Sequence, residues 1–232
     1  EDGRNFLAMG NSRYDVIVSE PSNAWLSGAS ILFTREYFAL IKNRLAEGGV
    51  FCQWFYSYSM SWDNILTLLK TLHAEFPNVR VFNFSKARFS GDLIILASRH
   101  RIDVTPRQVA GLDPRVSSIP ELDWIRTFND LMRGYVMGPD ELRRLAAGRP
   151  MHTDNRPRLE LRGPRDLFLD SQKNNLFQFV DNAPELTFEW TVESSGVDAA
   201  LGVAPRFEPG AFRVEESGIR VGRVRYLACQ PW

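Results

Sequence analysis

Cysteine is scarce in this chain of 232 residues, with Cys52 and Cys229 as its only two. Two cysteines cannot build the disulfide framework of a small secreted domain, and Cys52 lies within an apolar run. We therefore expect a buried structural thiol at Cys52 and a reducing, cytoplasmic location. A signal peptide and an apolar run of about eighteen residues are also lacking, which excludes a transmembrane helix within these residues.

Neither sign of charge is in excess. Lys and Arg total 28, as do Asp and Glu, so the net charge is zero. Proteins that bind nucleic acid or anionic membranes usually carry a basic excess. We therefore expect no nucleic-acid partner, and a membrane only through a region upstream of this chain. His73, His100 and His152 are scattered without the spacing of metal ligands, so no metal site is predicted.

Short apolar runs alternate with helical patterns over the first hundred residues. Residues 14–20 (YDVIVSE) form a continuous run typical of a strand buried on both faces. Its alternation with later helices and strands indicates parallel βαβ units. Residues 93–98 follow the preceding strand after a short polar connection, so we expect this last strand to be antiparallel. The other expected elements are strands at 50–55 and 79–84 and helices at 34–47 and 61–76. We expect Thr34 and Ser61 to cap the two helices, and Gly48 and Gly49 to end the first one.

These elements predict an α/β fold, the C-terminal half of a class I methyltransferase-like Rossmann sheet, followed by an α+β extension. No Gly-rich phosphate loop precedes residues 14–20 and the chain does not begin with Met, so we expect an N-terminal portion to be missing. The expected parts are a Rossmann-like domain (1–100), a connector (101–165) with helices at 121–133 and 139–147 and an extended segment at 152–165, and a β-rich extension of unknown role (166–232) with strands at 186–192 and 220–227.

Polar and acidic residues flank the first strand. Asp2-Gly3 precedes it and Glu20-Pro21-Ser22-Asn23 follows it, at the edge where open α/β sheets bind ligands. Asp2 lies thirteen residues before Asp15 in the run Tyr14-Asp15-Val16-Ile17. Leu32-Phe33 and Gly49-Val50-Phe51-Cys52-Gln53 come next. In this order, over residues 1–99, these motifs resemble the spermidine synthase (polyamine aminopropyltransferase) family.

The resemblance implies a transferase that moves an aminopropyl group from decarboxylated S-adenosylmethionine to a small-molecule amine. It allows a homodimer and needs no metal. The loop at 22–33, which includes Gly28, is expected to act as a lid. The implied site consists of Glu20 as catalytic base, Asp2, Gly3 and Pro21 at the cofactor, and Ser22, Asn23 and Gln53 at the amine.

The site departs from the family pattern at two positions. Glu20 stands where the family has its catalytic Asp, and Asn23 where a second Asp holds the ammonium group of the substrate. The pattern Ser-Glu-Pro-Ser-Asn and the segment 153–160 are closer to spermidine synthase-like proteins, many of which are fused to a membrane transporter-like region. Two alternatives stay open: a methyltransferase that uses S-adenosylmethionine itself, and a non-catalytic soluble module of a membrane protein. We expect Asp154 to cap a turn or to pair with a nearby Arg.

Overall fold

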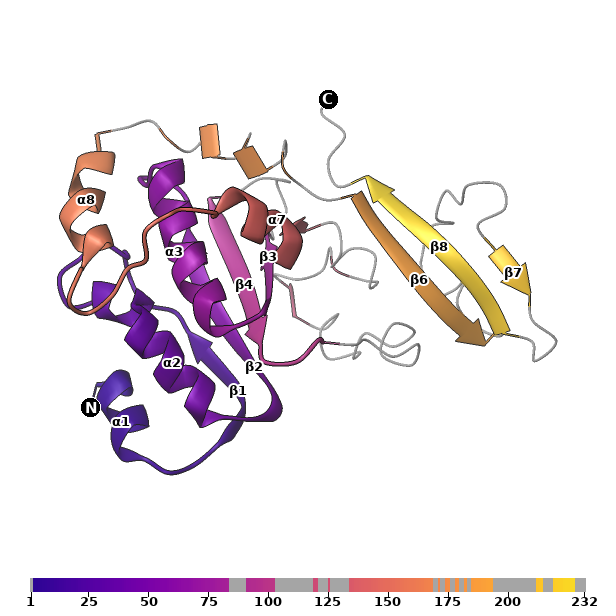
Figure 1. Cartoon of the computed structure of the whole chain (residues 1–232), viewed down its shortest axis with the longest axis horizontal. Coiled ribbons are helices and arrows are strands. Elements are labelled where there is room, and N and C mark those ends of the chain that lie inside the picture. Colours follow the sequence, from indigo (N-terminus) through magenta and orange to yellow (C-terminus); the bar gives the residue numbers. More distant parts are fainter. Residues whose placement is uncertain are drawn as a thin grey trace. The chain divides into compact units, whose positions relative to one another are not determined.

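The computed structural model contains two compact units, residues 1–102 with 136–182, and residues 103–135 with 183–232 (Figure 1). The helix expected at 121–133 falls almost wholly outside the described residues, and Cys229 lies outside them as well. The structure describes residues 2–83, 91–102, 119–120, 125, 134–168, 171, 174–175, 178–179 and 182, and the backbone of 185–193, 212–214 and 219–227.

Five strands form the sheet of the first unit, in the order β1-β2-β4-β3-β5. β1 (Tyr14–Ser19) and β2 (Leu45–Tyr56) are parallel. β4 (Asp92–Ser98) lies between β2 and β3 (Asn78–Phe82) and runs antiparallel to both. The predicted antiparallel direction of this strand is confirmed. β5 (Tyr135–Met137) follows β3 in the strand order.

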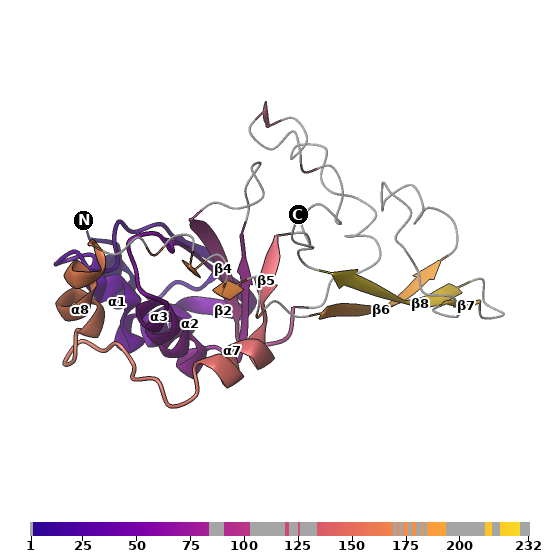
Figure 2. The ribbon, with the colours of Figure 1, turned by 90° about the horizontal axis from the view of Figure 1, so that it is seen from above.

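Helices α2 (Arg35–Arg44) and α3 (Trp62–Glu75) lie on the same face of this sheet (Figure 2). The Thr34 hydroxyl accepts a hydrogen bond from the backbone N–H of Tyr37 and so caps α2. Ser61 caps α3 in the same manner. Such caps satisfy backbone donors that the first turn of a helix leaves free. The structure therefore confirms both caps that the sequence predicts.

Phe51 of β2 is at the centre of the core between this sheet and its helices. Its ring lies 6.1 Å from that of Phe38 on α2 and 6.0 Å from that of Phe76, just after α3. All three rings are fully buried. Truncating such a ring to Ala costs about 3–5 kcal/mol because a cavity is left behind. This packing fixes the path of β2 and therefore the place where its carboxyl end lies.

β1 differs from the prediction that it is buried on both faces. The side chains of Val16 and Val18 are 59% and 67% exposed, whereas Ile17 between them is half-buried. β1 is the first strand in the sheet order, and α2 and α3 cover one face of that sheet. The prediction is wrong because, among the described residues, nothing covers the face of β1 that carries Val16 and Val18.

The boundary between α2 and β2 also differs from its prediction. The helix ends at Arg44, and the fully buried Leu45 already pairs with Tyr14 of β1. Gly48 (φ +78°) and Gly49 then form an irregularity in the strand pairing rather than a helix stop. A Cβ atom on Gly49 would lie 2.9 Å from the Tyr14 carbonyl oxygen, so the close approach of the two strands requires glycine there.

The helices α7 (Pro139–Leu145) and α8 (Arg158–Asp166) follow β5 in the described part of the first unit. α7 confirms the helix predicted at 139–147. The segment predicted as extended forms a turn and then α8, so that prediction is wrong. Leu159 and Gly163 are buried on α8, and their tertiary packing outweighs the low helix propensity of the glycine and proline within it.

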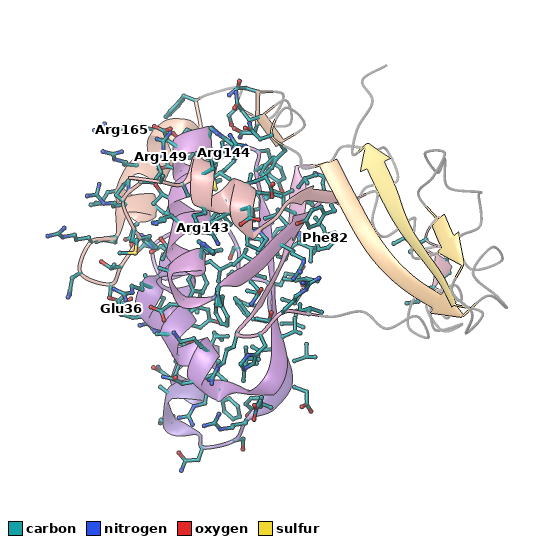
Figure 3. The ribbon with its side chains drawn as sticks, turned by 45° about the vertical axis from the view of Figure 1, so that its right-hand side comes forward. Glu36, Phe82, Arg143, Arg144, Arg149 and Arg165 are labelled. Atoms are coloured by element: carbon teal, nitrogen blue, oxygen red, sulfur yellow. The ribbon has the colours of Figure 1, made fainter. Side chains whose placement is uncertain are left out.

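Arginine side chains on and near α7 and α8 extend into solvent (Figure 3). Arg143 pairs with Asp140 at 2.7 Å, and Arg149 pairs with Asp63 at 2.5 Å. Ion pairs this exposed contribute about 0–1 kcal/mol to stability. These arginines form a solvated surface and take no part in the candidate site.

The second unit contains a separate three-stranded antiparallel sheet in the order β6-β8-β7. Its strands are β6 (Glu185–Glu193), β7 (Phe212–Val214) and β8 (Ile219–Leu227). The strands predicted at 186–192 and 220–227 are thereby confirmed. In the part of the chain that the structure describes, no helix has both the length and the apolar character needed to cross a membrane.

Candidate active site

Glu20 lies at the carboxyl end of β1. The strand ends at Ser19, which is buried, and the carboxylate of the next residue is exposed. Ser19 is paired in register with Gln53 of the parallel strand β2. β1 therefore ends beside Gln53 of β2, which continues to Tyr56. The carboxyl ends of parallel strands form the edge at which open α/β sheets bind ligands.

Gln53 supports this strand end from within the protein. Its side chain is fully buried, and Nε2 donates hydrogen bonds to the backbone carbonyls of Ser19 (3.2 Å) and Trp54 (2.8 Å). Oε1 is also buried, and no described residue supplies it with a hydrogen-bond partner. The amide of Gln53 thus holds the backbone directly before Glu20, a contribution that does not require contact with a substrate.

Tyr37 of α2 holds the same strand end from the helix side. Its hydroxyl donates a hydrogen bond of 3.4 Å to Oγ of Ser19. Burial is the main reason that the pKa of Tyr37 is raised, and the charges of Arg4 and Asp2 also act on the hydroxyl. Tyr37 therefore supports the end of β1 through its hydrogen bond to Ser19.

Asp2 caps the first helix, α1 (Gly3–Met9). Oδ1 of its carboxylate accepts a hydrogen bond of 3.0 Å from the backbone N–H of Arg4. Asp2 and Gly3 are both exposed. The carboxylate therefore has a structural role in addition to the predicted contact with adenine, and that contact stays a prediction.

The loop at 22–33 is held at two points and exposed between them. Ser22 is exposed and Asn23 half-buried, whereas Trp25 is 5% exposed and Ser30 fully buried. The Trp25 ring packs edge-to-face on Tyr56 at the end of β2, with ring centroids 5.5 Å apart. The exposed tip comprises residues 26–28 and turns at Gly28, whose φ of +87° favours glycine. A lid motion at this loop is therefore confined to the tip unless Trp25 and Ser30 leave their sites.

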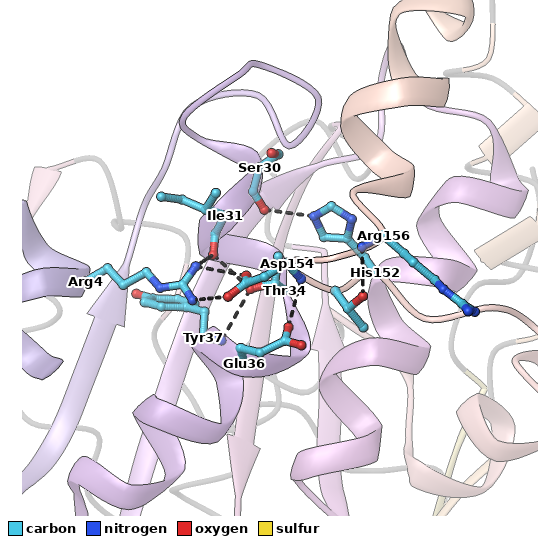
Figure 4. Close-up of polar contacts among 10 residues, drawn as sticks. Arg4, Ser30, Ile31, Thr34, Glu36, Tyr37, His152, Asp154 and Arg156 are labelled. Atoms are coloured by element: carbon cyan, nitrogen blue, oxygen red, sulfur yellow. Dashed lines mark hydrogen bonds and ion pairs between the residues drawn. The ribbon is translucent and has the colours of Figure 1, made fainter.

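A polar cluster beside this loop was not predicted as part of the site (Figure 4). It joins Arg4 of α1, Ser30 and Glu36 to His152 and Asp154. The sequence signal is the segment from Thr153 to Glu160, where Asp154 is expected to cap a turn or to pair with an Arg. That pairing is confirmed, with Arg4 as the partner at 2.5 Å.

His152 is neutral in this cluster. Its side chain is fully buried, and this burial lowers its pKa. Nδ1 accepts a hydrogen bond of 3.3 Å from the Leu159 backbone N–H. Nε2 therefore carries the proton and donates it to the Ser30 carbonyl oxygen at 2.9 Å. Neither nitrogen is left over to bind a metal, and the described residues contain no group of three acidic, His or Cys side chains that is placed to bind one.

Cys52 lies on β2, next to Gln53. Its thiol is free and half-buried rather than fully buried, and this partial burial raises its pKa. A thiol with a raised pKa is a poor nucleophile, because the thiolate is the reactive form. Cys52 is therefore assigned a packing role, as the sequence predicts.

Residues 1–103 match the Spermine/spermidine synthase domain. Polyamine aminopropyltransferase 2 of Pseudomonas aeruginosa is 29% identical over 118 residues, which are 50% of this chain and 34% of that protein. Spermidine synthase of Dictyostelium discoideum is 31% identical over 93 residues, 40% of this chain and 32% of that protein. Over these residues the chain is similar to members of the spermidine synthase superfamily.

Among solved structures, a probable spermidine synthase from Corynebacterium glutamicum is 19% identical, with a TM-score of 0.46 over 66% of this chain and 52% of that one. The chain spans 34% and 32% of the length of the two curated relatives. The match to the spermidine synthase domain ends at residue 103, so it includes all of the predicted site residues but not the segment with His152 and Asp154.

Proposed function

We propose that the protein transfers an aminopropyl group from decarboxylated S-adenosylmethionine to an amine. The observation that carries the proposal is the position of Glu20. Its exposed carboxylate directly follows Ser19, whose backbone Gln53 holds at the carboxyl edge of two parallel strands. The match of residues 1–103 to the spermidine synthase domain supports this reaction.

In this reaction, the nitrogen of a neutral amine attacks the propyl carbon that is bonded to the sulfonium sulfur. The new C–N bond forms as the C–S bond breaks, and the electron pair of that bond returns to sulfur. The attack gives an aminopropylated ammonium ion and the neutral thioether 5′-methylthioadenosine, and loss of one proton from this ammonium ion gives the product amine. Glu20 accepts one proton from the attacking nitrogen, so the enzyme contributes positioning and proton removal.

The other predicted residues are assigned to the two substrates. We propose that Asp2 accepts a hydrogen bond from the adenine amino group, with Gly3 beside it. Ser22 and Asn23 follow Glu20 on the loop and contact the amine. Pro21 is buried between them and the strand, so it shapes the cofactor side of the site without donating a hydrogen bond. Gln53 acts through the backbone of Ser19.

A methyltransferase that uses S-adenosylmethionine is the second candidate, and one observation favours it. The segment from Glu20 to Asn23 carries a single carboxylate, and the second position has an uncharged amide. One carboxylate attracts a diamine cation less strongly than two. A methyl acceptor without a second ammonium group would not need the missing charge.

The two donors give different products, which separates the candidates. The test incubates the protein with putrescine and one donor at a time and identifies the nucleoside product by mass spectrometry. Aminopropyl transfer yields 5′-methylthioadenosine from decarboxylated S-adenosylmethionine. Formation of S-adenosylhomocysteine from S-adenosylmethionine, without the first product, contradicts the proposal and supports the alternative.

A further inference from the structure

Residues 152–163, which we call the clasp, contact both parts of the candidate site. They begin with a tight turn in which Thr153 and Arg156 exchange backbone hydrogen bonds, and they continue into α8. Three separate contacts join the clasp to the loop at 22–33 and to α1. Glu160 and His152 make the first contact, Gly163 the second and Asp154 the third.

The first contact fixes Ser30, at the end of the exposed part of the loop. The Ser30 hydroxyl donates a hydrogen bond of 2.7 Å to Oε2 of Glu160, and its carbonyl accepts one from Nε2 of His152 at 2.9 Å. Ser30 and His152 are both fully buried. Because these polar groups are out of water, each lost hydrogen bond leaves a partner unsatisfied, so the loop and the clasp hold one another in place.

The second contact fixes Trp25. A Cβ atom built on Gly163 of α8 would lie 2.3 Å from Cβ of Trp25. Only a residue without a side chain allows this approach, and Trp25 is in turn packed on Tyr56 of β2. The helix therefore presses Trp25 against the end of the strand that carries Gln53.

The third contact reaches the opposite part of the site. The Arg4 guanidinium donates two hydrogen bonds to the Asp154 carboxylate, at 3.1 and 2.5 Å, and a third to the Ile31 carbonyl at 3.0 Å. Arg4 lies in the helix that Asp2 caps. One clasp carboxylate thus ties the predicted adenine end of the site to the loop (Figure 4).

We infer that Glu160 and Gly163 are positioning residues of the candidate site. They hold the loop at Ser30 and Trp25. The side chains of Ser22 and Asn23, which precede Trp25 in the loop, thereby keep their positions relative to the Glu20 carboxylate. This inference rests on the proposed function for its kinetic consequence, but not for its structural one. The clasp lies beyond the residues that match the spermidine synthase domain, so this part of the chain contributes to a site whose chemical groups lie elsewhere.

The test compares Glu160→Ala and Gly163→Ala with Glu160→Gln and with Arg162→Ala. Glu160→Gln keeps an oxygen that accepts the Ser30 hydrogen bond. Arg162 is on the same helix but exposed, so its variant controls for changes in α8 that do not touch the loop. The first measurement is limited proteolysis by chymotrypsin, with cleavage after the exposed Leu26 identified by mass spectrometry.

We expect cleavage after Leu26 to be about tenfold faster in Glu160→Ala and Gly163→Ala, because the loop leaves its anchors more often. Glu160→Gln and Arg162→Ala should be cleaved like the wild type. Steady-state kinetics should show KM for the amine raised about tenfold in the first two variants, with kcat changed less. A thermal melt that stays cooperative shows that the variants are folded.

Equal cleavage after Leu26 in all folded variants would overturn the inference, whatever the activity. If the wild type transfers no aminopropyl group, the proposed function fails, and the cleavage rates still decide whether the clasp holds the loop. A variant of Gly163 that does not fold leaves the decision to Glu160→Ala, which adds no atoms to the packed interface. Faster cleavage without a rise in KM for the amine would also contradict the positioning role.

Discussion

The side-chain amide of Gln53 donates a hydrogen bond of 3.2 Å to the backbone carbonyl of Ser19 on the neighbouring strand. This bond joins the last residue of β1 to β2 just before the chain reaches Glu20. A buried side chain therefore sets where an exposed carboxylate lies. The predictions below separate such supporting roles from contacts with substrates.

Gln53→Leu should lower the free energy of unfolding by about 1–3 kcal/mol, because the backbone carbonyls of Ser19 and Trp54 lose their donor while side-chain volume is roughly kept. Denaturant unfolding measures this as a lower midpoint at unchanged slope. Leu96→Met, at a half-buried position on the neighbouring strand β4, provides a control of similar volume without a polar change. An unchanged midpoint for Gln53→Leu would show that the hydrogen bond contributes nothing.

Glu20→Gln should reduce kcat by about a hundredfold or more, because the amide cannot accept the proton of the attacking nitrogen. The melting temperature should stay the same, since the side chain is exposed. Asp15→Asn removes another exposed carboxylate of the same region and should leave kcat near the wild-type value. Equal losses of activity in both variants would argue for a general effect of charge rather than a catalytic base.

Asp2→Ser and Asp2→Ala separate the two roles of Asp2. Serine also caps helices, so only the alanine variant should free the start of α1, at a cost of about 0.5–2 kcal/mol in helix stability. Hydrogen exchange of the Arg4 amide measures this cost. Both variants should weaken binding of the nucleoside donor in calorimetry. Wild-type affinity in Asp2→Ser would leave capping as the function of this carboxylate.

Stability should fall as the pH is lowered from 7.5 to 5.5. Burial lowers the pKa of His152 and of His73 in the folded state, so below pH 6.5 the unfolded chain binds protons that the folded chain does not. The contribution of these two histidines to the free energy of unfolding is therefore fully present above pH 6.5. It is lost as the pH falls from 6.5 to their lower folded-state pKa values. Thermal melts at both pH values should show a smaller difference in His152→Gln than in the wild type. An identical pH dependence in the two proteins would contradict the neutral, buried state of His152.

Most of the fold of the first hundred residues could be predicted from the sequence, because its signals are local. The caps at Thr34 and Ser61 and the polar connection before residues 93–98 each act within a few residues. The errors have a common cause in tertiary contacts. Leu45 joins the sheet through Tyr14, and α8 forms because Gly163 packs on Trp25.

The candidate site also combines features that local sequence signals predict with features that depend on tertiary contacts. Glu20 could be placed at a strand end from the apolar run before it, whereas the adenine contact of Asp2 is implied by the family resemblance and stays a prediction. The anchors of the loop could not be foreseen, because Ser30 and Glu160 are 130 residues apart in the chain. Burial of Gln53 likewise depends on packing across the sheet and gives this residue a supporting role, while its predicted contact with the amine stays a prediction.

The most direct test of the account measures the nucleoside product of the protein with decarboxylated S-adenosylmethionine and putrescine, in the wild type and in Glu20→Gln. The account predicts formation of 5′-methylthioadenosine together with an aminopropylated amine in the wild type, and at least about a hundredfold less of both in the variant. Undiminished product formation in Glu20→Gln, or no 5′-methylthioadenosine from the wild type, would contradict it.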